Sequence, residues 1–242
     1  QYCKLEKVSD HPPHLELELN YSCNLRCPMC TWSVETTAEK KEDWFTFEDY
    51  KKIINEAVSI GTRSIRLTYI NEPLIRQDID QFIKYAIDAG IIDVIITTNG
   101  TLMTKAMSKK MIDAGLTKIN VSLDAITDET YDKIRVGGNL KITTKNILDF
   151  LELRKEMNKK LPKIRLTFVA SKINFHEYDS FVNFWKDKVD SLGIQHLQNP
   201  FGEGSFKDDK KGEEIILKKN PIPEKFNCPE PFKRLTLRSN GD

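Results

Sequence analysis

The chain has 242 residues, enough for one large α/β domain or two smaller domains. Lys and Arg number 37 and Asp and Glu 36, so the net charge of +1 gives no long-range field typical of a nucleic-acid-binding protein. No run of about 18 apolar residues and no signal-peptide pattern occurs, which predicts a cytoplasmic protein without membrane spans.

Short β-branched runs alternate with amphipathic helical segments along the chain. The predicted strands cover residues 15–19, 64–70, 93–98, 118–124, 163–171 and 193–198. The predicted helices cover residues 46–61, 78–89, 104–114, 129–135, 143–158 and 176–188. Six such repeats imply parallel strands joined by right-handed helical crossovers. A doubly wound open sheet and a barrel-like sheet both satisfy this pattern.

Polar or metal-binding residues follow four successive predicted strands. The segment NYSCNLRCPMCTWS (20–33) follows the first strand, Asn71-Glu72-Pro73 the second and Thr98-Asn99-Gly100 the third, while Ser122 and Asp124 end the fourth. Because ligand sites of parallel α/β folds lie at the C-terminal strand ends, these groups are predicted to form one site.

Three cysteines lie close together in that first loop, at Cys23, Cys27 and Cys30. Structural zinc normally takes four ligands, and no second Cys/His pair lies nearby. Buried structural thiols are a poor match for a polar loop, and disulfides are rare in cytoplasmic proteins. Iron–sulfur ligation is favoured, and because a four-iron cluster needs one ligand per iron, three thiolates leave one iron open to a substrate or cosubstrate.

The C-x3-C-x2-C spacing, placed after the first strand of a repeating βα chain, resembles the radical S-adenosylmethionine (SAM) superfamily over residues 15–198. The resemblance implies an α/β fold, a partial (β/α)6 TIM-like barrel over residues 1–200. It implies a 4Fe-4S cluster on Cys23, Cys27 and Cys30 whose open iron binds SAM. Reductive cleavage of SAM would then release a 5′-deoxyadenosyl radical that takes a hydrogen atom from the substrate.

The resemblance also implies SAM contacts at the strand ends. Glu72 would accept the SAM ammonium and Arg135 would pair with the SAM carboxylate, as a guanidinium favours. Each residue taken alone can equally serve local structure. Glycines common in the family are replaced by Ile70 and Asn71, and Met29 stands where an aromatic residue is more usual. The implied cofactor-binding residues are Met29, Asn71, Glu72, Asn99, Ser122, Asp124, Arg135 and Val169.

The C-terminal segment NCPEPFKRLTLRSNGD (227–242) resembles the opening of the auxiliary-cluster domains called SPASM or twitch. Residues 201–242 are predicted to form a connector and the start of a small cysteine-bearing β-hairpin domain. Cys228 would ligate an auxiliary iron–sulfur cluster, and Leu235 and Leu237 would lie on a hairpin strand that turns at Asn240-Gly241. Further cysteines are expected beyond Asp242, and Cys3 is predicted to be a plain thiol.

The resemblance implies a radical SAM enzyme that oxidises or rearranges a small-molecule substrate, sugar-like or aminocyclitol-like, with a flavodoxin- or ferredoxin-type reductant. SPASM-type modification of a ribosomally made peptide is an alternative. Two alternatives from other classes are a non-catalytic iron–sulfur electron-transfer protein and a zinc-binding interaction module.

Overall fold

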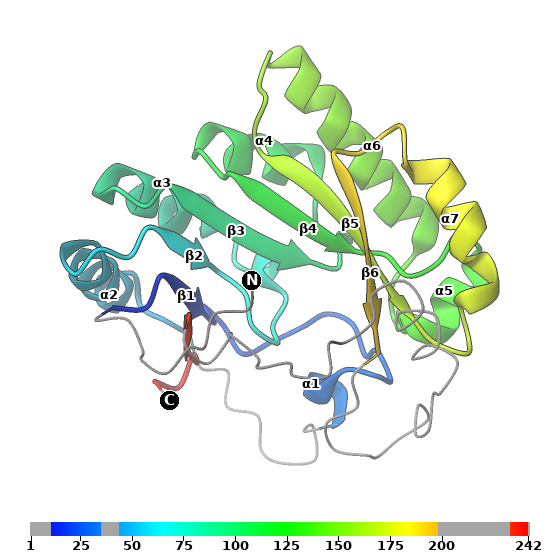
Figure 1. The fold of residues 1–242 in the computed structure, drawn as a ribbon, viewed down its shortest axis with the longest axis horizontal. Helices are drawn as coiled ribbons and strands as arrows, with labels where there is room; N and C mark the ends of the chain where they lie inside the picture. The colour runs from blue at the N-terminus through cyan, green and yellow to red at the C-terminus, as the bar shows by residue number, and fades with distance from the viewer. Residues whose placement is uncertain (1–10, 35–43, 198–232, 242) are drawn as a thin grey trace, which may run out of the picture.

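The computed structural model describes residues 11–34, 44–197 and 233–241, which form a seven-stranded parallel sheet lined by helices on one face (Figure 1). The strands lie in the order β6-β5-β4-β3-β2-β1-β7. They are β1 (His14–Leu17), β2 (Ser64–Arg66), β3 (Asp93–Thr98), β4 (Lys118–Ser122), β5 (Lys163–Ala170), β6 (Ser191–His196) and β7 (Arg234–Leu237). The predicted α/β fold with parallel strands is confirmed, and the sheet is open, as in a partial barrel.

The helices connect consecutive strands and pack against their neighbours. They are α1 (Thr31–Val34), α2 (Phe47–Ser59), α3 (Ile79–Ala89), α4 (Lys105–Asp113), α5 (Asp128–Ile134), α6 (Leu140–Glu156) and α7 (Tyr178–Trp185), with 3-10 turns η2 (Pro73–Ile75) and η3 (Phe175–Glu177). Thr46 and Thr104 cap α2 and α4, because their side chains accept hydrogen bonds from backbone N–H groups of the first helical turn. None of the helices in the described part of the chain is long and apolar enough to cross a membrane.

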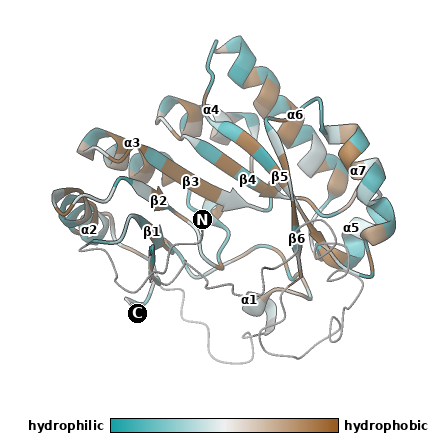
Figure 2. Cartoon of the chain, viewed as in Figure 1, coloured by the Kyte–Doolittle hydropathy of each residue, from teal (hydrophilic) through white to brown (hydrophobic). Residues whose placement is uncertain are grey.

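The core lies between the sheet and helices α2 to α7. Strand residues that face the helices, such as Ile65, Val94 and Ile119, are fully buried. Figure 2 shows apolar residues along β3 and β4 and alternating apolar and polar stripes on the helices. Side chains alternate between the two faces of a strand, so the intervening residues stand on the side away from these helices, here called the open face.

The second strand is shorter than predicted. The sequence pattern extends to Ile70, but β2 ends at Arg66. Beyond it, backbone N–H groups bond to side chains: Tyr69 N–H donates to Asn71 Oδ1 (3.0 Å) and Ile70 N–H to Glu18 Oε1 (3.3 Å). Because these donors are satisfied outside a β ladder, the chain leaves the sheet early and turns toward η2.

The C-terminal strand differs from the prediction in its partner. Residues 235 and 237 were expected on a hairpin of a separate domain, but β7 pairs in parallel with β1, with Leu17 opposite Leu237. The pairing of β7 with β1 is favoured by an ion pair between the Glu16 carboxylate on β1 and Arg234 on β7. The predicted turn is present, with Gly241 at φ 90 and its N–H bonded to Arg238 O (3.0 Å). Cys3 and Cys228 lie outside the described residues, and the division of the chain at residue 200 stays a prediction.

Candidate functional site

The cysteine loop connects β1 to α1 at the C-terminal end of the sheet. Cys23, Cys27 and Cys30 are free thiols, with Cys27 buried and the other two half-buried. Cys27 O accepts a hydrogen bond from Cys30 N–H (3.0 Å), and Arg26 N–H donates to Val136 O (2.9 Å) after α5. Backbone contacts therefore hold this loop, and the thiols stay available for ligation.

The three thiols lie within one another's electrostatic field. Burial raises the pKa of Cys23 to about 11, and Glu72, Cys27 and Cys30 add to the rise. Burial also raises the pKa of Cys27, and Arg135 opposes it. Such thiols ionise only when a cationic centre compensates the charge. No three His, Cys, Asp or Glu side chains in the described ranges are grouped closely enough to hold one metal ion. The donor set fits a cluster with one thiolate per iron better than a single zinc ion.

Glu72 joins the end of β2 to the end of β3. Its side chain is 2% exposed; Oε1 accepts hydrogen bonds from Leu74 N–H (3.1 Å) and Thr98 Oγ1 (2.6 Å), and Oε2 accepts one from Asn99 N–H (2.7 Å). Burial raises the pKa of Glu72 to about 7 despite these hydrogen bonds. A carboxyl with this pKa becomes a full anion readily when a cation binds beside it.

Asn99 fastens the cysteine loop to the end of β3. Its Nδ2 donates to Asn24 Oδ1 (2.9 Å) and lies 3.9 Å from Cys23 Sγ. Its Oδ1 accepts hydrogen bonds from Thr101 N–H (2.9 Å) and Thr101 Oγ1 (2.6 Å). Asn24 was not predicted as a site residue, because a loop asparagine between two cysteines has no distinctive sequence pattern.

Asn71 fastens the segment after β2 to the start of the same loop. Its Nδ2 donates to Asn20 Oδ1 (3.0 Å), and Asn20 Nδ2 donates to Ser22 Oγ (3.0 Å). Glu72 N–H also donates to Ser22 O (2.8 Å). The amide of Asn71 is thus engaged in holding the loop, and a direct SAM contact by Asn71 stays a prediction.

Asp124 and Arg135 form a buried ion pair beside Cys27. Asp124 is fully buried at φ 60; Oδ1 accepts a hydrogen bond from Val169 N–H (2.7 Å), and Oδ2 binds Arg135 Nη2. Arg135 Nη1 lies 3.8 Å from Cys27 Sγ. The pair therefore connects the ends of β4 and β5 to the cysteine loop. The guanidinium predicted to bind the SAM carboxylate has a protein carboxylate as its partner here.

Three other predicted residues have half-buried side chains at this end of the sheet. Ser122 ends β4 half-buried, and its hydroxyl makes no hydrogen bond to the residues that the structure describes. Val169 on β5 and Met29 in the cysteine loop are also half-buried. These three side chains remain accessible to a ligand at the strand ends.

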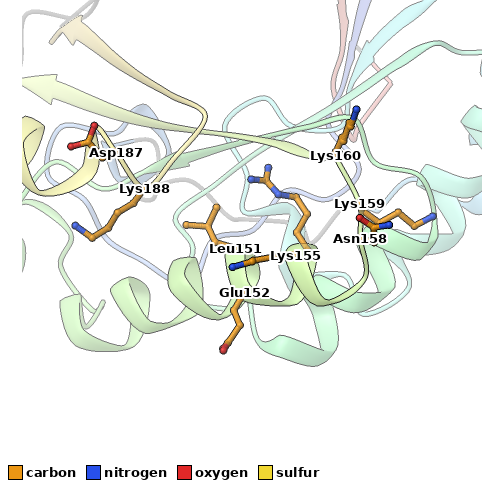
Figure 3. A pocket seen from close by; sticks show the side chains of 9 residues that line it. Leu151, Glu152, Lys155, Asn158, Lys159, Lys160, Asp187 and Lys188 are labelled. Carbon is orange, nitrogen blue, oxygen red and sulfur yellow. The ribbon is translucent and has the colours of Figure 1, made fainter.

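A groove of about 700 Å³ lies away from this site, at the C-terminal end of α6 (Figure 3). Its lining residues are Leu151, Glu152, Arg154, Lys155, Asn158, Lys159, Lys160, Asp187 and Lys188. The chain enters β5 just beyond this groove, so the groove lies at the N-terminal end of the strands. Helix α6 has 17 residues and is about 25 Å long, which separates the groove from the cysteine loop.

Comparison with known proteins places these cysteines and strand ends in a family. The model of the Radical SAM superfamily matches residues 17–185. The chain belongs to the radical SAM superfamily. This superfamily assignment brings two cofactors, a 4Fe-4S cluster and SAM, and the free thiols of the β1–α1 loop are the donor set that fits the cluster.

Two curated radical SAM relatives are named GTP 3′,8-cyclase. The protein of Aliarcobacter butzleri (strain RM4018) is 30% identical over 212 residues, 77% of this chain and 64% of the relative. The protein of Alkaliphilus oremlandii (strain OhILAs) is 29% identical over 230 residues, 93% of this chain and 69% of the relative. This chain therefore spans about two thirds of the length of these proteins.

Solved structures with the same fold include two radical SAM proteins bound to SAM. Streptococcus suis SuiB bound to S-adenosylmethionine has a TM-score of 0.75 at 19% identity, over 99% of this chain and 61% of SuiB. The protein anSMEcpe with bound AdoMet has a TM-score of 0.66 at 16% identity, over 85% of this chain and 56% of anSMEcpe. At these identities the likeness concerns the fold.

Proposed function

We propose that this protein is a radical SAM enzyme that removes a hydrogen atom from a small-molecule substrate. The observation that carries the proposal is the convergence of three free thiols with Glu72, Asn99 and Arg135 at neighbouring strand ends. A cluster held by these thiols would supply the electron for the cleavage of SAM into methionine and a 5′-deoxyadenosyl radical.

The thiols of Cys23, Cys27 and Cys30 are proposed to ligate three irons. Asn99 Nδ2 lies 3.9 Å from Cys23 Sγ, and Arg135 Nη1 lies 3.8 Å from Cys27 Sγ. Donors beside metal-bound sulfur orient the ligand and stabilise its negative charge. Asn99 and Arg135 are therefore proposed as positioning residues for the thiolates.

The proposed SAM contacts are made by side chains that can still accept or donate a hydrogen bond or pack against the ligand. Glu72 Oε2 accepts one protein hydrogen bond, which leaves a lone pair for the SAM ammonium. The Ser122 hydroxyl is open to a second SAM group. Val169 and Met29 are proposed to pack against the adenine, where a thioether suits an aromatic ring. Asp124 is proposed to act through Arg135, whose guanidinium it holds.

The substrate, partners and compartment are proposed at a coarse level. Curated relatives named GTP 3′,8-cyclase favour a small molecule over a peptide. No comparison supports a sugar-like or aminocyclitol-like substrate in particular. A flavodoxin- or ferredoxin-type reductant in the cytoplasm and an auxiliary cluster at Cys228 complete the proposal.

The test is anaerobic reconstitution with iron and sulfide, reduction with dithionite, and chromatography for 5′-deoxyadenosine. Wild type is expected to form this product, whereas Cys27→Ala is expected to lose it together with the cluster absorbance. Cys228→Ala is expected to retain part of the activity, because that residue serves a different cluster. An intact cluster with SAM bound but no product would instead support an electron-transfer protein. Zinc without iron on elemental analysis would support an interaction module.

A further inference from the structure

Arg165 on β5 is an exposed cationic side chain that has no partner among the residues that the structure describes. It lies opposite Asn120 of β4 and Ser191 of β6 in the sheet register. Its neighbours Ile164 and Leu166 are fully buried against the helices, so Arg165 stands on the open face. No hydrogen bond or ion pair joins its guanidinium to any residue in the described ranges.

The guanidinium of Arg165 lies directly over Gly193 of β6. A Cβ built on Gly193 would be 2.1 Å from Nη2, 2.4 Å from Nε and 2.6 Å from Cζ of Arg165. Gly193 is in register with Thr167, two residues closer to the C-terminal end of β5 than Arg165. The absence of a side chain at position 193 therefore lets the guanidinium lean toward the strand ends that carry the proposed SAM site.

Hydroxyl groups stand in the same row of the sheet. Ser122 of β4 is opposite Thr167 of β5, which in turn is opposite Gly193, and adjacent parallel strands are about 4.8 Å apart. The hydroxyls of Ser122 and Thr167 make no hydrogen bond within the described part of the chain. The guanidinium of Arg165 and the hydroxyl of Thr167 can therefore donate to the same bound group, while Ser122, one strand further, stays available to SAM.

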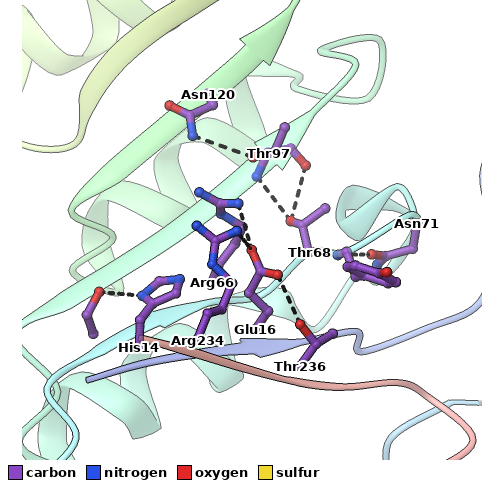
Figure 4. Close-up of polar contacts among 11 residues, drawn as sticks. His14, Glu16, Arg66, Thr68, Asn71, Thr97, Asn120, Arg234 and Thr236 are labelled. Carbon is purple, nitrogen blue, oxygen red and sulfur yellow. Dashed lines mark hydrogen bonds and ion pairs between the residues drawn. The ribbon is translucent and has the colours of Figure 1, made fainter. Parts of the chain in front are cut away.

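Two other arginines on the open face form ion pairs with a carboxylate. Arg66 and Arg234 both bind Glu16 Oε1, at 2.7 and 2.8 Å, and Thr236 donates to Glu16 Oε2 (Figure 4). These groups lie on β1, β2 and β7, toward the opposite edge of the sheet from Arg165 on β5. Arg66 is thus paired with a protein carboxylate, whereas Arg165 has none in the part of the chain that the structure describes.

Two carboxylates next to strands β4 and β6 are already engaged. Asp190, just before β6, binds Arg154 and Lys163, and Asp124, just after β4, binds Arg135. Within the described residues, the guanidinium of Arg165 therefore faces the open side of β4, β5 and β6 without a carboxylate.

We propose that Arg165, held over Gly193, binds a carboxylate or phosphate group of the substrate beside the hydroxyl of Thr167. A guanidinium makes paired, charge-assisted hydrogen bonds to either oxyanion. The substrate class is therefore an organic acid or a phosphate ester. This inference rests on the proposed function, since it assigns the substrate of the same site.

The test is calorimetric binding to the reconstituted protein with SAM present and no reductant, using pyrophosphate, GTP and succinate as separate probes. At least one probe is expected to bind wild type, and pyrophosphate against succinate separates phosphate from carboxylate recognition. Arg165→Gln is expected to weaken that binding roughly ten- to hundredfold, since a hydrogen-bonded charge is lost. Arg165→Lys is expected to recover part of it. Lys155→Gln removes the same charge at the distant α6 groove and is expected to bind like wild type.

Gly193→Ala supplies a variant with no change in charge. The added methyl would occupy the space of the guanidinium, which must move, while its φ stays in the range open to other residues. The variant is expected to weaken probe binding as Arg165→Gln does, with an unchanged Tm, because only the mobile end of a side chain is displaced.

Equal binding by wild type and Arg165→Gln, or no binding of any probe to wild type, would overturn the inference. A loss of Tm in Arg165→Gln matching its loss of binding would also overturn it, because the residue would then be structural. The proposed function fails independently, since 5′-deoxyadenosine formation is measured with reductant. A protein that binds a probe but forms no 5′-deoxyadenosine contradicts the function alone.

Discussion

The burial of Glu72 predicts that the cluster-free protein loses stability as pH rises. Its pKa is raised from 4.5 to about 7, so the folded state binds this proton more tightly than the unfolded state. The contribution is fully present below about pH 4.5 and is lost as pH rises through about 7. At about 1.4 kcal/mol per pKa unit, the loss between these limits is about 3 kcal/mol. Glu72→Gln removes the titration while keeping the side-chain shape.

Urea denaturation of both proteins at intervals from pH 5 to pH 8, without reconstitution, measures this effect. The free energy of unfolding of wild type is expected to fall relative to that of Glu72→Gln by up to about 3 kcal/mol between pH 5 and pH 8, and any constant offset at pH 5 reflects the hydrogen bond that the amide nitrogen cannot accept. Glu48→Gln, at an exposed position in the first turn of α2, is the matched control and should follow wild type. If the free energies of unfolding of wild type and Glu72→Gln changed with pH in parallel, burial would not be the main influence on the pKa of Glu72.

Three further substitutions test the site and its support. Cys27→Ala is expected to lower bound iron and the cluster absorbance after reconstitution, because one iron loses its thiolate. Asp124→Asn keeps a residue that tolerates φ 60 but leaves Arg135 buried without its carboxylate, so the free energy of unfolding in urea should fall by about 3–5 kcal/mol. Gly100→Ala places a Cβ 3.0 Å from Val121 Cγ1 at φ 77, and calorimetry should show a loss of about 1–3 kcal/mol.

The parts of the fold that depend on sequence patterns within one segment were predictable. Periodicity located helices α2 to α7 and six of the strands, and Thr46 caps α2 where the predicted helix begins, whereas the four-residue α1 was not predicted. The partner of residues 234–237 was not predictable, because pairing β7 with β1 depends on a contact between Glu16 and Arg234, 218 positions apart. A local pattern of alternating residues describes a strand and says nothing about its neighbour in the sheet.

The site was predictable as a set of strand ends and less so as a set of contacts. The sequence placed Glu72 and Asn99 at one edge, and the structure joins them by a hydrogen bond. It did not indicate Asn24, whose role depends on how the cysteine loop folds over β3. Arg165 had no signal at all, since one arginine in a strand is typical of a surface position until the register sets it over Gly193. The roles of these residues toward SAM stay predictions.

The pairing of β1 with β7 has a consequence for synthesis of the chain. One edge of β1 is covered by residues that are translated more than 200 positions later. At about 5–20 residues per second, that edge is unpaired for roughly 10–40 s on the ribosome. Unpaired edges of this kind associate with other strands, and the buried charge of Glu16 on β1 disfavours such contacts. We therefore expect the carboxylate that later binds Arg234 to reduce aggregation of the nascent sheet.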